Sequence, residues 1–321
     1  MAVYTEVQPD ELAAFIASYG LGRVLGLHGI AQGVENTNYR IDTERGRYLL
    51  TLYEKRVNAT DLPFFLGLMD HLAARGLNCP VPVHNAQGVI LGELAGRPAA
   101  LVTWLEGAWP RTQNVAQCGE LGGALAELHL DGAGFALTRA NALGPSGWRP
   151  LFATFRSEAH RIAPDLGDTI ARELDHVERH WPADLPHGVI HADLFPDNAF
   201  FIGDTLSGIF DFYFACNDAL AYDLAVCLNA WCFTAAHVFE AEKCRAMVQR
   251  YQSVRPLSAA ERAAMPILAR GAALRFLLTR AHDWIYTAPG ALVERKDPGE
   301  FLAKLRFHQG VSDAAVYGLE G

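Results

Sequence analysis

The residues best suited to chemistry lie in the segment His191–Asn198, which reads H-A-D-L-F-P-D-N, and at Asp211, thirteen positions further on. The H-x-D-x-x-x-x-N spacing followed by Asp-Phe is the layout of a phosphoryl-transfer site. Such a site needs one carboxylate near the acceptor hydroxyl and two oxygen ligands for magnesium. We therefore predict Asp193 as the catalytic carboxylate, and Asn198 and Asp211 as the metal ligands.

A structural explanation competes with this one, because Asp and Asn often cap turns and hairpins. A lone H-x-D would not outweigh that explanation. The full spacing, together with Pro196 and the Asp-Phe pair, favours catalysis. In that interpretation Asp193 accepts or orients a hydroxyl proton, which typically contributes about 10²–10⁴ in rate. We place His191 in the same catalytic loop, where it more often orients the loop than reacts.

The chain before this motif has the alternating pattern of an antiparallel β-rich module. The turn at 44–46 ends in Gly46, where a positive φ is expected. Asp10 is the predicted cap of the first helix, Thr60 that of the second, and Gly76 its stop. The predicted strands are 24–27, 37–41, 47–53, 89–91 and 99–104, and the predicted helices are 11–20 and 60–76.

The second half of the chain is mostly helical in pattern. A β-hairpin with strands at 198–202 and 206–213 is expected to turn at Gly203, which brings Asn198 and Asp211 together at its other end. The predicted fold class is therefore α+β and bilobal. An antiparallel β lobe with one main helix (1–104) precedes a helical lobe with a catalytic hairpin (105–321). Helical stretches are expected at 115–130, 219–252, 258–287 and 301–305, and a loop at 139–150.

Composition excludes some partners and compartments. The net charge of −9 over 321 residues argues against a nucleic acid held by phosphate contacts. The N-terminus lacks the basic and apolar regions of a signal peptide, and Leu224–Phe239 is too short to span a bilayer, so we interpret it as a buried helix. Six cysteines without a C-x-x-C pair indicate free, mostly buried thiols. We expect a cytoplasmic protein with no membrane partner.

The catalytic segment resembles that of the aminoglycoside phosphotransferase and choline kinase superfamily, which shares the protein-kinase-like fold. The helix Leu121–His129 (LGGALAELH) is similar to the L-G-x-x-L-A-x-L-H helix of that superfamily, although core packing alone would also explain its leucines. Within the superfamily, the chain looks most like the bacterial homoserine kinases of this fold, over about residues 1–310. The stretches that carry this closer likeness are Gly33–Tyr39, Tyr48–Lys55, Leu62–Phe65 and Asp211–Asp218.

The resemblance implies a kinase that uses ATP and Mg²⁺ to phosphorylate the side-chain hydroxyl of L-homoserine, a step of threonine biosynthesis. Residues Gly29–Asn38 would form a loop over the nucleotide, although a plain β-turn competes with that reading. Val102–Gly107 would form the hinge that binds adenine through its backbone. Asp223 would tie the catalytic loop by hydrogen bonds. The nucleotide residues assigned in these two segments are Gly33, Asn36, Asn38, Thr103 and Leu105.

One position departs from the superfamily pattern. Kinases of this fold usually carry a lysine on the third strand that pairs with the nucleotide phosphates, and here the aligned position is Thr51. The first lobe contains one lysine, Lys55. Either Lys55 or Arg47 is left to reach the phosphates, or the metal ions carry more of the charge. The sequence leaves these alternatives open.

A small zwitterionic acceptor needs a cation for its carboxylate and an acid or carbonyl for its ammonium group. Arginine is suited to the first task because its guanidinium can bind a carboxylate through two hydrogen bonds. A solvated helix surface with intrahelical pairs is an equally simple account of such residues. The candidate substrate residues are Asn217, Asp218, Arg275, Arg280 and Asp283.

Three other functions stay open at this point. The acceptor could be another small alcohol or amine, such as choline, hydroxylysine, a sugar or an aminoglycoside. The missing lysine would also suit a nucleotide-binding regulatory protein with little turnover. A metal-dependent hydrolase is a weaker alternative, because the sequence shows no clustered histidine ligands. The sequence does not give the oligomeric state or the preference between ATP and GTP.

Overall fold

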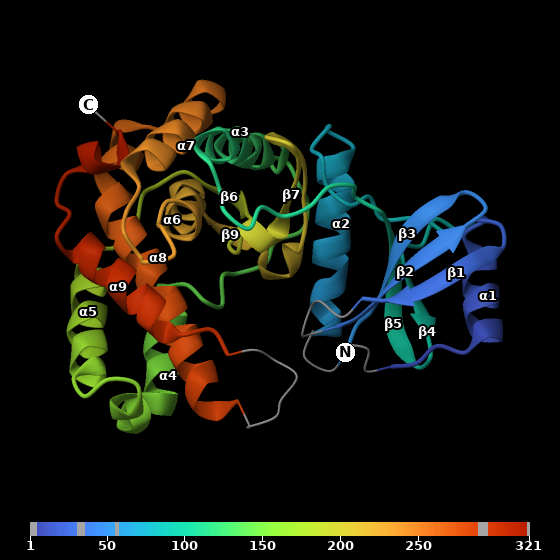
Figure 1. Cartoon of the computed structure of the whole chain (residues 1–321), viewed down its shortest axis with the longest axis horizontal. Coiled ribbons are helices and arrows are strands. Elements are labelled where there is room, and N and C mark those ends of the chain that lie inside the picture. Colours follow the sequence, from blue (N-terminus) through green and yellow to red (C-terminus); the bar gives the residue numbers. More distant parts are fainter. Residues whose placement is uncertain (1–4, 31–35, 55–57, 288–294, 320–321) are drawn as a thin grey trace. The chain divides into compact units, whose positions relative to one another are not determined.

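The computed structural model describes residues 5–30, 36–54, 58–287 and 295–319. The chain forms two compact units. The first contains residues 1–107 together with 207–213, and the second contains 108–206 together with 214–321. A β-rich unit is therefore followed by a mainly helical one (Figure 1). The division of function between lobes at 104–105 stays a prediction.

The first unit is built on a five-stranded antiparallel sheet with the order β1-β2-β3-β5-β4. In Figure 1 this sheet lies between helices α1 and α2. Apolar side chains of α1, among them Leu12 and Ile16, join Ile41, Leu50 and Leu101 of the sheet in one buried core. The elements are α1 (Pro9–Ser18), β1 (Val24–Gly29), β2 (Thr37–Thr43), β3 (Gly46–Leu52), α2 (Leu62–Ala73), β4 (Leu91–Leu94) and β5 (Arg97–Thr103).

The local signals of the first unit are mostly confirmed. Gly46 has a φ of 138° where β2 turns into β3, and Gly76 has a φ of 102° just after α2. The predicted helix caps are wrong. Asn58 accepts from the backbone N of Thr60, so the cap lies two residues earlier, while Asp10 lies in the first turn of α1 behind Gln8. The strand predicted at 89–91 begins only at its last residue.

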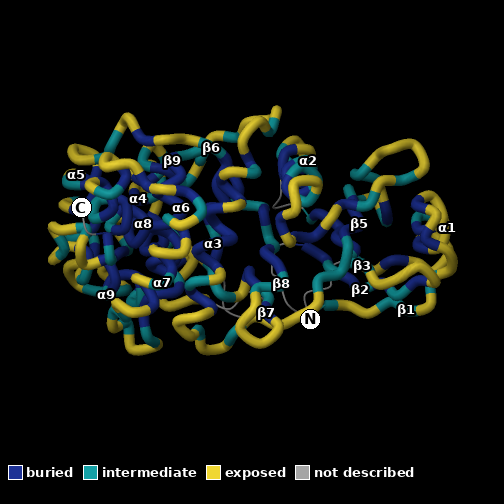
Figure 2. The backbone as a smooth tube through the Cα atoms, turned by 90° about the horizontal axis from the view of Figure 1, so that it is seen from above, coloured by how far each residue is buried: buried dark blue, intermediate teal, exposed yellow. Residues whose placement is uncertain are grey.

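The second unit packs its helices around α6 and α8, whose residues are largely buried (Figure 2). Small two-stranded sheets, β6-β9 and β7-β8, accompany the helices, and the hairpin β7-β8 confirms the predicted pair with Gly203 at a φ of 63°. The elements are α3 (Val115–Asp131), α4 (Pro145–Phe155), α5 (Leu166–His180), β6 (His187–Ile190), β7 (Ala199–Ile202), β8 (Thr205–Ile209), β9 (Cys216–Ala219), α6 (Leu220–Trp231), α7 (Ala241–Val254), α8 (Ala259–Tyr286) and α9 (Pro298–Gln309).

Three predictions for the rest of the chain are wrong. The strand expected at 206–213 ends at Ile209, and Phe212–Phe214 form a short 3₁₀ helix. The loop expected at 139–150 ends earlier, because α4 starts at Pro145, where a proline fits the first turn of a helix, and buries Trp148. The helical stretch expected at 219–252, and with it the helix read over 224–239, is interrupted after Trp231. A β-bridge between Phe233 and Phe239 closes a turn there before α7 begins. The pair β6-β9 was not predicted.

The six cysteines are all free and buried, which confirms the prediction of unpaired, mostly buried thiols. Burial raises the pKa of each of Cys79 and Cys216 to about 12, so both stay protonated. Among the residues that the structure describes, no helix combines the length and the apolar character needed to cross a bilayer.

The contact between α3 and α7 depends on a glycine in the LGGALAELH helix. A Cβ atom built on Gly122 would lie 2.2 Å from the backbone O of Met247, far inside van der Waals contact. Gly119, on the same helix, has its nearest such neighbour, the backbone O of Ala246, at 3.8 Å. Gly122 is therefore needed for the close approach of α3 and α7, whereas the position of Gly119 has room for a Cβ atom.

We predict that Gly122→Ala destabilises the fold by about 1–3 kcal/mol, because the helices must move apart to admit the methyl group. Gly119→Ala is the matched control. It should be neutral or stabilising by up to about 1 kcal/mol, because alanine favours the helix. Urea unfolding of both variants measures the difference. Equal stabilities for the two would contradict this account of the contact.

Candidate active site

The catalytic loop leaves β6 at Ile190, where β6 pairs with β9 in antiparallel register. Its second residue, Ala192, has a φ of 63°, in the left-handed region. That conformation costs an L-residue other than glycine roughly 1–2 kcal/mol, so it persists only where neighbouring groups hold it. In this loop the neighbouring groups approach from two sides.

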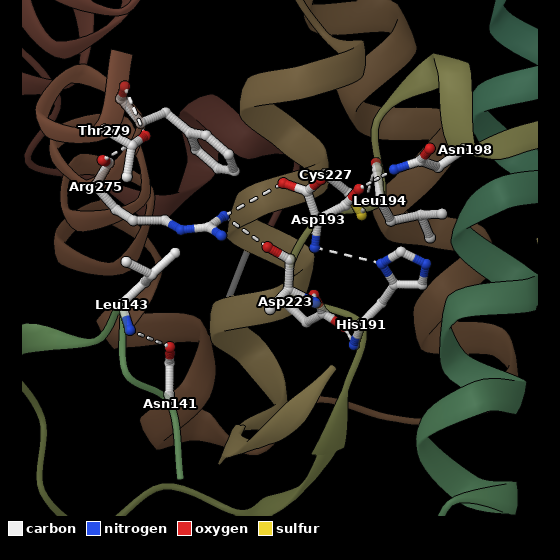
Figure 3. Close-up of polar contacts among 12 residues, drawn as sticks. Asn141, Leu143, His191, Asp193, Leu194, Asn198, Asp223, Cys227, Arg275 and Thr279 are labelled. Atoms are coloured by element: carbon white, nitrogen blue, oxygen red, sulfur yellow. Dashed lines mark hydrogen bonds and ion pairs between the residues drawn. The ribbon is translucent and has the colours of Figure 1, made fainter. Parts of the chain in front are cut away.

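On one side, the carboxylate of Asp223 on α6 accepts two consecutive backbone amides of the loop. Its Oδ2 is 2.7 Å from the N of His191 and its Oδ1 is 2.8 Å from the N of Ala192 (Figure 3). Oδ2 also lies 3.1 Å from Nε2 of His129 on α3. Asp223 is fully buried. The predicted role of Asp223, tying the catalytic loop by hydrogen bonds, is confirmed.

The surroundings of Asp223 keep it ionised. Burial is the largest single influence and would by itself raise the pKa of this carboxyl group. The hydrogen bond from the His129 imidazole and the backbone N–H of His191, with the electrostatic influence of both imidazoles, together lower the pKa below its ordinary value of 3.8. An ionised carboxylate is the form that can accept all of these N–H groups.

On the other side, Arg275 of α8 holds the same loop. Its Nη1 donates to the backbone O of Ala192 over 2.6 Å and lies 3.7 Å from Oδ1 of Asp193. The guanidinium stacks 4.0 Å from the ring centroid of Phe276 and is only 3% exposed. Figure 3 shows it reaching Asp193 from the side opposite His191. Arg275, predicted to bind the substrate carboxylate, is thus placed against the catalytic loop.

Further anchors fix the rest of the loop. The backbone O of Leu194 accepts from Nε1 of Trp231 at 2.8 Å and from the thiol of Cys227 at 3.8 Å. Nδ1 of His191 lies 3.3 Å from the backbone N of Asp193, so the buried imidazole orients the residue that carries the carboxylate. Sequence reasoning missed Trp231 and Cys227, because in the sequence they look like ordinary members of an apolar helix.

Asn198 ends the short 3₁₀ helix Pro196–Asn198 and faces back to the loop. Its Nδ2 donates to the backbone O of Asp193 over 2.8 Å, which directs its amide oxygen away from that carbonyl (Figure 3). An amide oxygen beside a carboxylate is a hard donor set of the kind that suits magnesium. Asp211, two residues beyond β8 with a φ of 64°, belongs to the first unit. Its predicted approach to Asn198 stays a prediction.

The candidate acceptor residues on β9 support a neighbouring segment. Oδ1 of Asn217 accepts from the backbone N of Arg139 at 2.8 Å. Oδ2 of Asp218 accepts from Nδ2 of Asn141 at 2.7 Å. Both side chains therefore hold residues 139–141 beside β9. Their part in acceptor binding stays a prediction.

The remaining candidates on α8 contact α9 or a neighbouring residue of α8. Arg280 pairs with Glu300 of α9 and stacks 4.4 Å from the ring centroid of Phe301. The side chain of Asp283 is 67% exposed and its Oδ1 lies 3.3 Å from Nδ1 of His282. Of the three charged candidates on α8, only Arg275 is brought to Asp193.

In the first unit, the candidate nucleotide residues lie at both ends of the sheet. Asn38 accepts from Oγ1 of Thr51 at 2.8 Å, and Asn36 accepts from the backbone N of Glu54 at 3.2 Å. Oγ1 of Thr103 accepts from the backbone N of Val81 at 2.9 Å. Leu105 lies just beyond β5 and is half-buried, whereas Gly33 and Lys55 lie outside the described residues.

Arg47 lies at the opposite end of β3 from the residues that pair with the start of β2. It is opposite Asp42 in the register, while Thr37, the first residue of β2, is opposite Leu52. Its guanidinium forms ion pairs with Asp42 at 3.2 Å and with Glu106 at 3.1 Å. Five residues of strand, about 16 Å, separate Arg47 from Leu52.

Thr51, where the superfamily usually has lysine, belongs to a buried network of neutral hydroxyl groups. The hydroxyls of Tyr53 and Tyr213 are 3.1 Å apart, and Tyr213 packs edge-on against Phe65 of α2. Burial, the largest influence, raises the pKa of Tyr213 to about 12. Sequence reasoning missed both tyrosines, although Tyr213 directly follows the Asp-Phe pair.

Comparison with known proteins agrees with this geometry. The family described as "Phosphotransferase enzyme family" matches residues 26–257. The chain belongs to this family. Its curated relatives include a homoserine kinase from Afipia carboxidovorans, 60% identical over 99% of this chain and 98% of the relative. Another, from Paramagnetospirillum magneticum, is 58% identical over the whole of both chains.

A solved structure supports the fold of this family member. An amicoumacin kinase in complex with AMP-PNP, Ca²⁺ and Ami superimposes with a TM-score of 0.67, covering 94% of this chain and 92% of that one. The two sequences are 16% identical, so the likeness concerns the fold. Together with the antiparallel sheet and the helical second unit, it confirms the predicted α+β class.

We predict that Asp223→Asn lowers both stability and turnover of this phosphotransferase. The amide puts an N–H₂ group where a carboxylate oxygen accepted a loop N–H, and each buried donor left unsatisfied costs about 1–3 kcal/mol. Because the pKa of Asp223 is lowered in the fold, its contribution is complete above pH 3.8 and is lost as the pH falls through the folded value. The variant should lack that acid-dependent loss in urea unfolding series. Unchanged stability at neutral pH would rule out the tether.

Proposed function

We propose that the chain is an ATP-dependent homoserine kinase. It transfers the γ-phosphoryl group of ATP to the side-chain hydroxyl of L-homoserine and yields O-phospho-L-homoserine, a step of threonine biosynthesis. The observation that carries the proposal is the 58–60% identity to curated homoserine kinases over essentially the full length of both chains. The fixed catalytic loop of the second unit supplies the chemistry expected of such an enzyme.

In this proposal Asp193 acts on the acceptor. Its side chain is 22% exposed, so a hydroxyl group can reach it, while Arg275 and the neighbouring backbone fix its direction. As the hydroxyl oxygen attacks the γ-phosphorus, its proton passes to the Asp193 carboxylate. The new O–P bond forms while the bond from the γ-phosphorus to the bridging oxygen breaks, and ADP leaves. The loop contributes chiefly by positioning this carboxylate.

Asn198 and Asp211 are the residues that would hold magnesium. Both offer hard oxygen donors, and the amide of Asn198 is already turned so that its nitrogen serves the loop. The ion, when bound, neutralises charge on the nucleotide phosphates. Calcium and AMP-PNP in the amicoumacin kinase complex support a cation and a nucleotide in this fold.

For the phosphate cation we propose Lys55 rather than Arg47. In the sequence, Lys55 follows the end of β3 that pairs with the start of β2. The start of β2 belongs to the segment Gly29–Asn38, which is predicted to cover the nucleotide. Arg47 lies at the other end, where Asp42 and Glu106 already balance its charge. For the acceptor, Arg275 is the predicted cation nearest to the base, and Asn217, Asp218, Arg280 and Asp283 remain candidates.

The acceptor is tested by a coupled assay for ADP formation. We expect turnover with L-homoserine, loss of turnover when EDTA removes divalent ions, and recovery with added magnesium. Choline, hydroxylysine, a sugar and an aminoglycoside serve as comparison acceptors. Faster turnover with any of these than with L-homoserine would replace the proposed acceptor. Tight nucleotide binding without turnover on any acceptor would point to a regulatory protein.

The catalytic carboxylate is tested by Asp193→Asn. We expect kcat to fall by about 10²–10⁴, since the amide cannot take the hydroxyl proton, with the KM for ATP changed far less. Asp197→Asn is the control, because Asp197 lies four residues away, is 50% exposed and pairs only at 3.5 Å with Lys296. Near-normal turnover by a folded Asp193→Asn enzyme would show that the base is assigned to the wrong residue.

A further inference from the structure

The Asp223 tether continues outward as a buried chain of polar groups. Nδ1 of His129 lies 2.7 Å from the hydroxyl of Tyr251 on α7. Nη1 of Arg255 donates to that hydroxyl over 3.1 Å, and its Nη2 donates to Glu261 over 2.8 Å. Each of these side chains is buried. The chain therefore runs through buried side chains from the N-terminus of α8 to the catalytic loop.

The donor and acceptor capacities of these side chains determine which group donates in each hydrogen bond. Arginine has donors and no acceptor, so Arg255 must donate to the oxygen of Tyr251. The tyrosine has one hydrogen, and His129 is the remaining neighbour to receive it. Burial, the largest influence, raises the pKa of Tyr251, so the hydroxyl keeps that hydrogen. Nδ1 of His129 then accepts, and its proton lies on Nε2, which donates to Asp223.

A His129 ring protonated on both nitrogens would leave the Tyr251 hydroxyl hydrogen without an acceptor. If His129 carried protons on both ring nitrogens, Nδ1 and Arg255 would both donate to the Tyr251 oxygen. The tyrosine hydrogen would then have no acceptor among its hydrogen-bonded neighbours, at a cost of about 1–3 kcal/mol for a buried donor. Only the Tyr251 hydroxyl would separate the positive imidazole from the Arg255 guanidinium along this chain. The charge of Arg255 is already balanced by Glu261.

We propose that Tyr251 and Arg255 are positioning residues that hold His129 as the neutral tautomer protonated on Nε2. In that state Asp223 receives one imidazole N–H in addition to the amides of His191 and Ala192, and the loop that carries Asp193 keeps its geometry. The groups that face His129 are Asp223 from α6 and Tyr251 from α7; beyond Tyr251 lie Arg255, which follows the last residue of α7, and Glu261 from α8. The effect on turnover rests on the proposed kinase function, whereas the tautomer does not.

A second buried pair of the same kind provides a control within the same unit. Nδ1 of His308 on α9 lies 2.7 Å from the hydroxyl of Tyr317, and its Nε2 lies 3.1 Å from Oδ1 of Asn229. Burial, the largest influence, lowers the pKa of His308 to about 3, so this imidazole is neutral too. Its hydrogen bonds lead to α6 and the C-terminal residues and not to the catalytic loop.

The first test uses the unaltered protein. Nitrogen-15 NMR of the histidine rings distinguishes a protonated from an unprotonated ring nitrogen, and His129→Gln identifies the signals of His129 by their loss. We expect one protonated nitrogen, Nε2, and one unprotonated nitrogen, Nδ1, at neutral pH. Two protonated nitrogens at neutral pH, or the proton on Nδ1, would overturn the proposal. This result requires no acceptor and no turnover.

The second test compares Tyr251→Phe with Tyr317→Phe. Both remove one hydroxyl from a buried tyrosine–histidine pair, and Tyr251→Phe also removes the oxygen that accepts from Arg255. We expect only Tyr251→Phe to change the His129 signals and to lower kcat, by about tenfold, with the KM values for ATP and L-homoserine within about twofold. Equal turnover in the two variants would show that the chain does not position the loop. Absence of turnover in the parent enzyme would instead refute the proposed function and leave the tautomer result standing.

Discussion

A single carboxylate that accepts two consecutive backbone amides supports the chemistry of this protein. Ala192 adopts a left-handed φ that an alanine does not adopt without help, and Asp223 below it and Arg275 beside it supply that help. The same turn aims Asp193 outward and lets its backbone carbonyl receive Asn198. The left-handed turn at Ala192 therefore sets the directions of Asp193, the proposed base, and of Asn198, a proposed metal ligand.

The helices of the second unit can be understood as the support for that loop. Helix α6 provides Asp223 and Trp231, α8 provides Arg275, and α3 provides His129. Helix α3 lies close to α7 because Gly122 leaves room for the backbone of Met247. Burying charged groups is costly unless their donors and acceptors are paired, and here Asp223, Arg275 and Arg255 each have hydrogen-bond partners. The helices that form the core of the second unit therefore also fix the position of the loop.

Local signals in the sequence were sufficient to predict much of the fold and the position of the loop. The spacing from His191 to Asn198 and the periodicity of the strands depend on near neighbours, so they predicted the loop and the sheet correctly. The position of Arg275 depends on a contact across 83 residues, which no local pattern contains. The start of α4 was missed because Pro145 suits both a loop and a first helical turn. The break after Trp231 follows from a bridge between Phe233 and Phe239, inside an apolar run that reads as a continuous helix.

The segment 207–213 leaves the second unit, joins the first and returns. Within the first unit the backbone N of Ile209 donates to the O of Asn78, and Ser207 donates to the O of Glu106. A nascent chain that has emerged only as far as residue 107 therefore lacks a part of its first unit, which arrives about a hundred residues later. Completion of the N-terminal unit is therefore coupled to synthesis of residues 207–213, which lie in the second half of the chain.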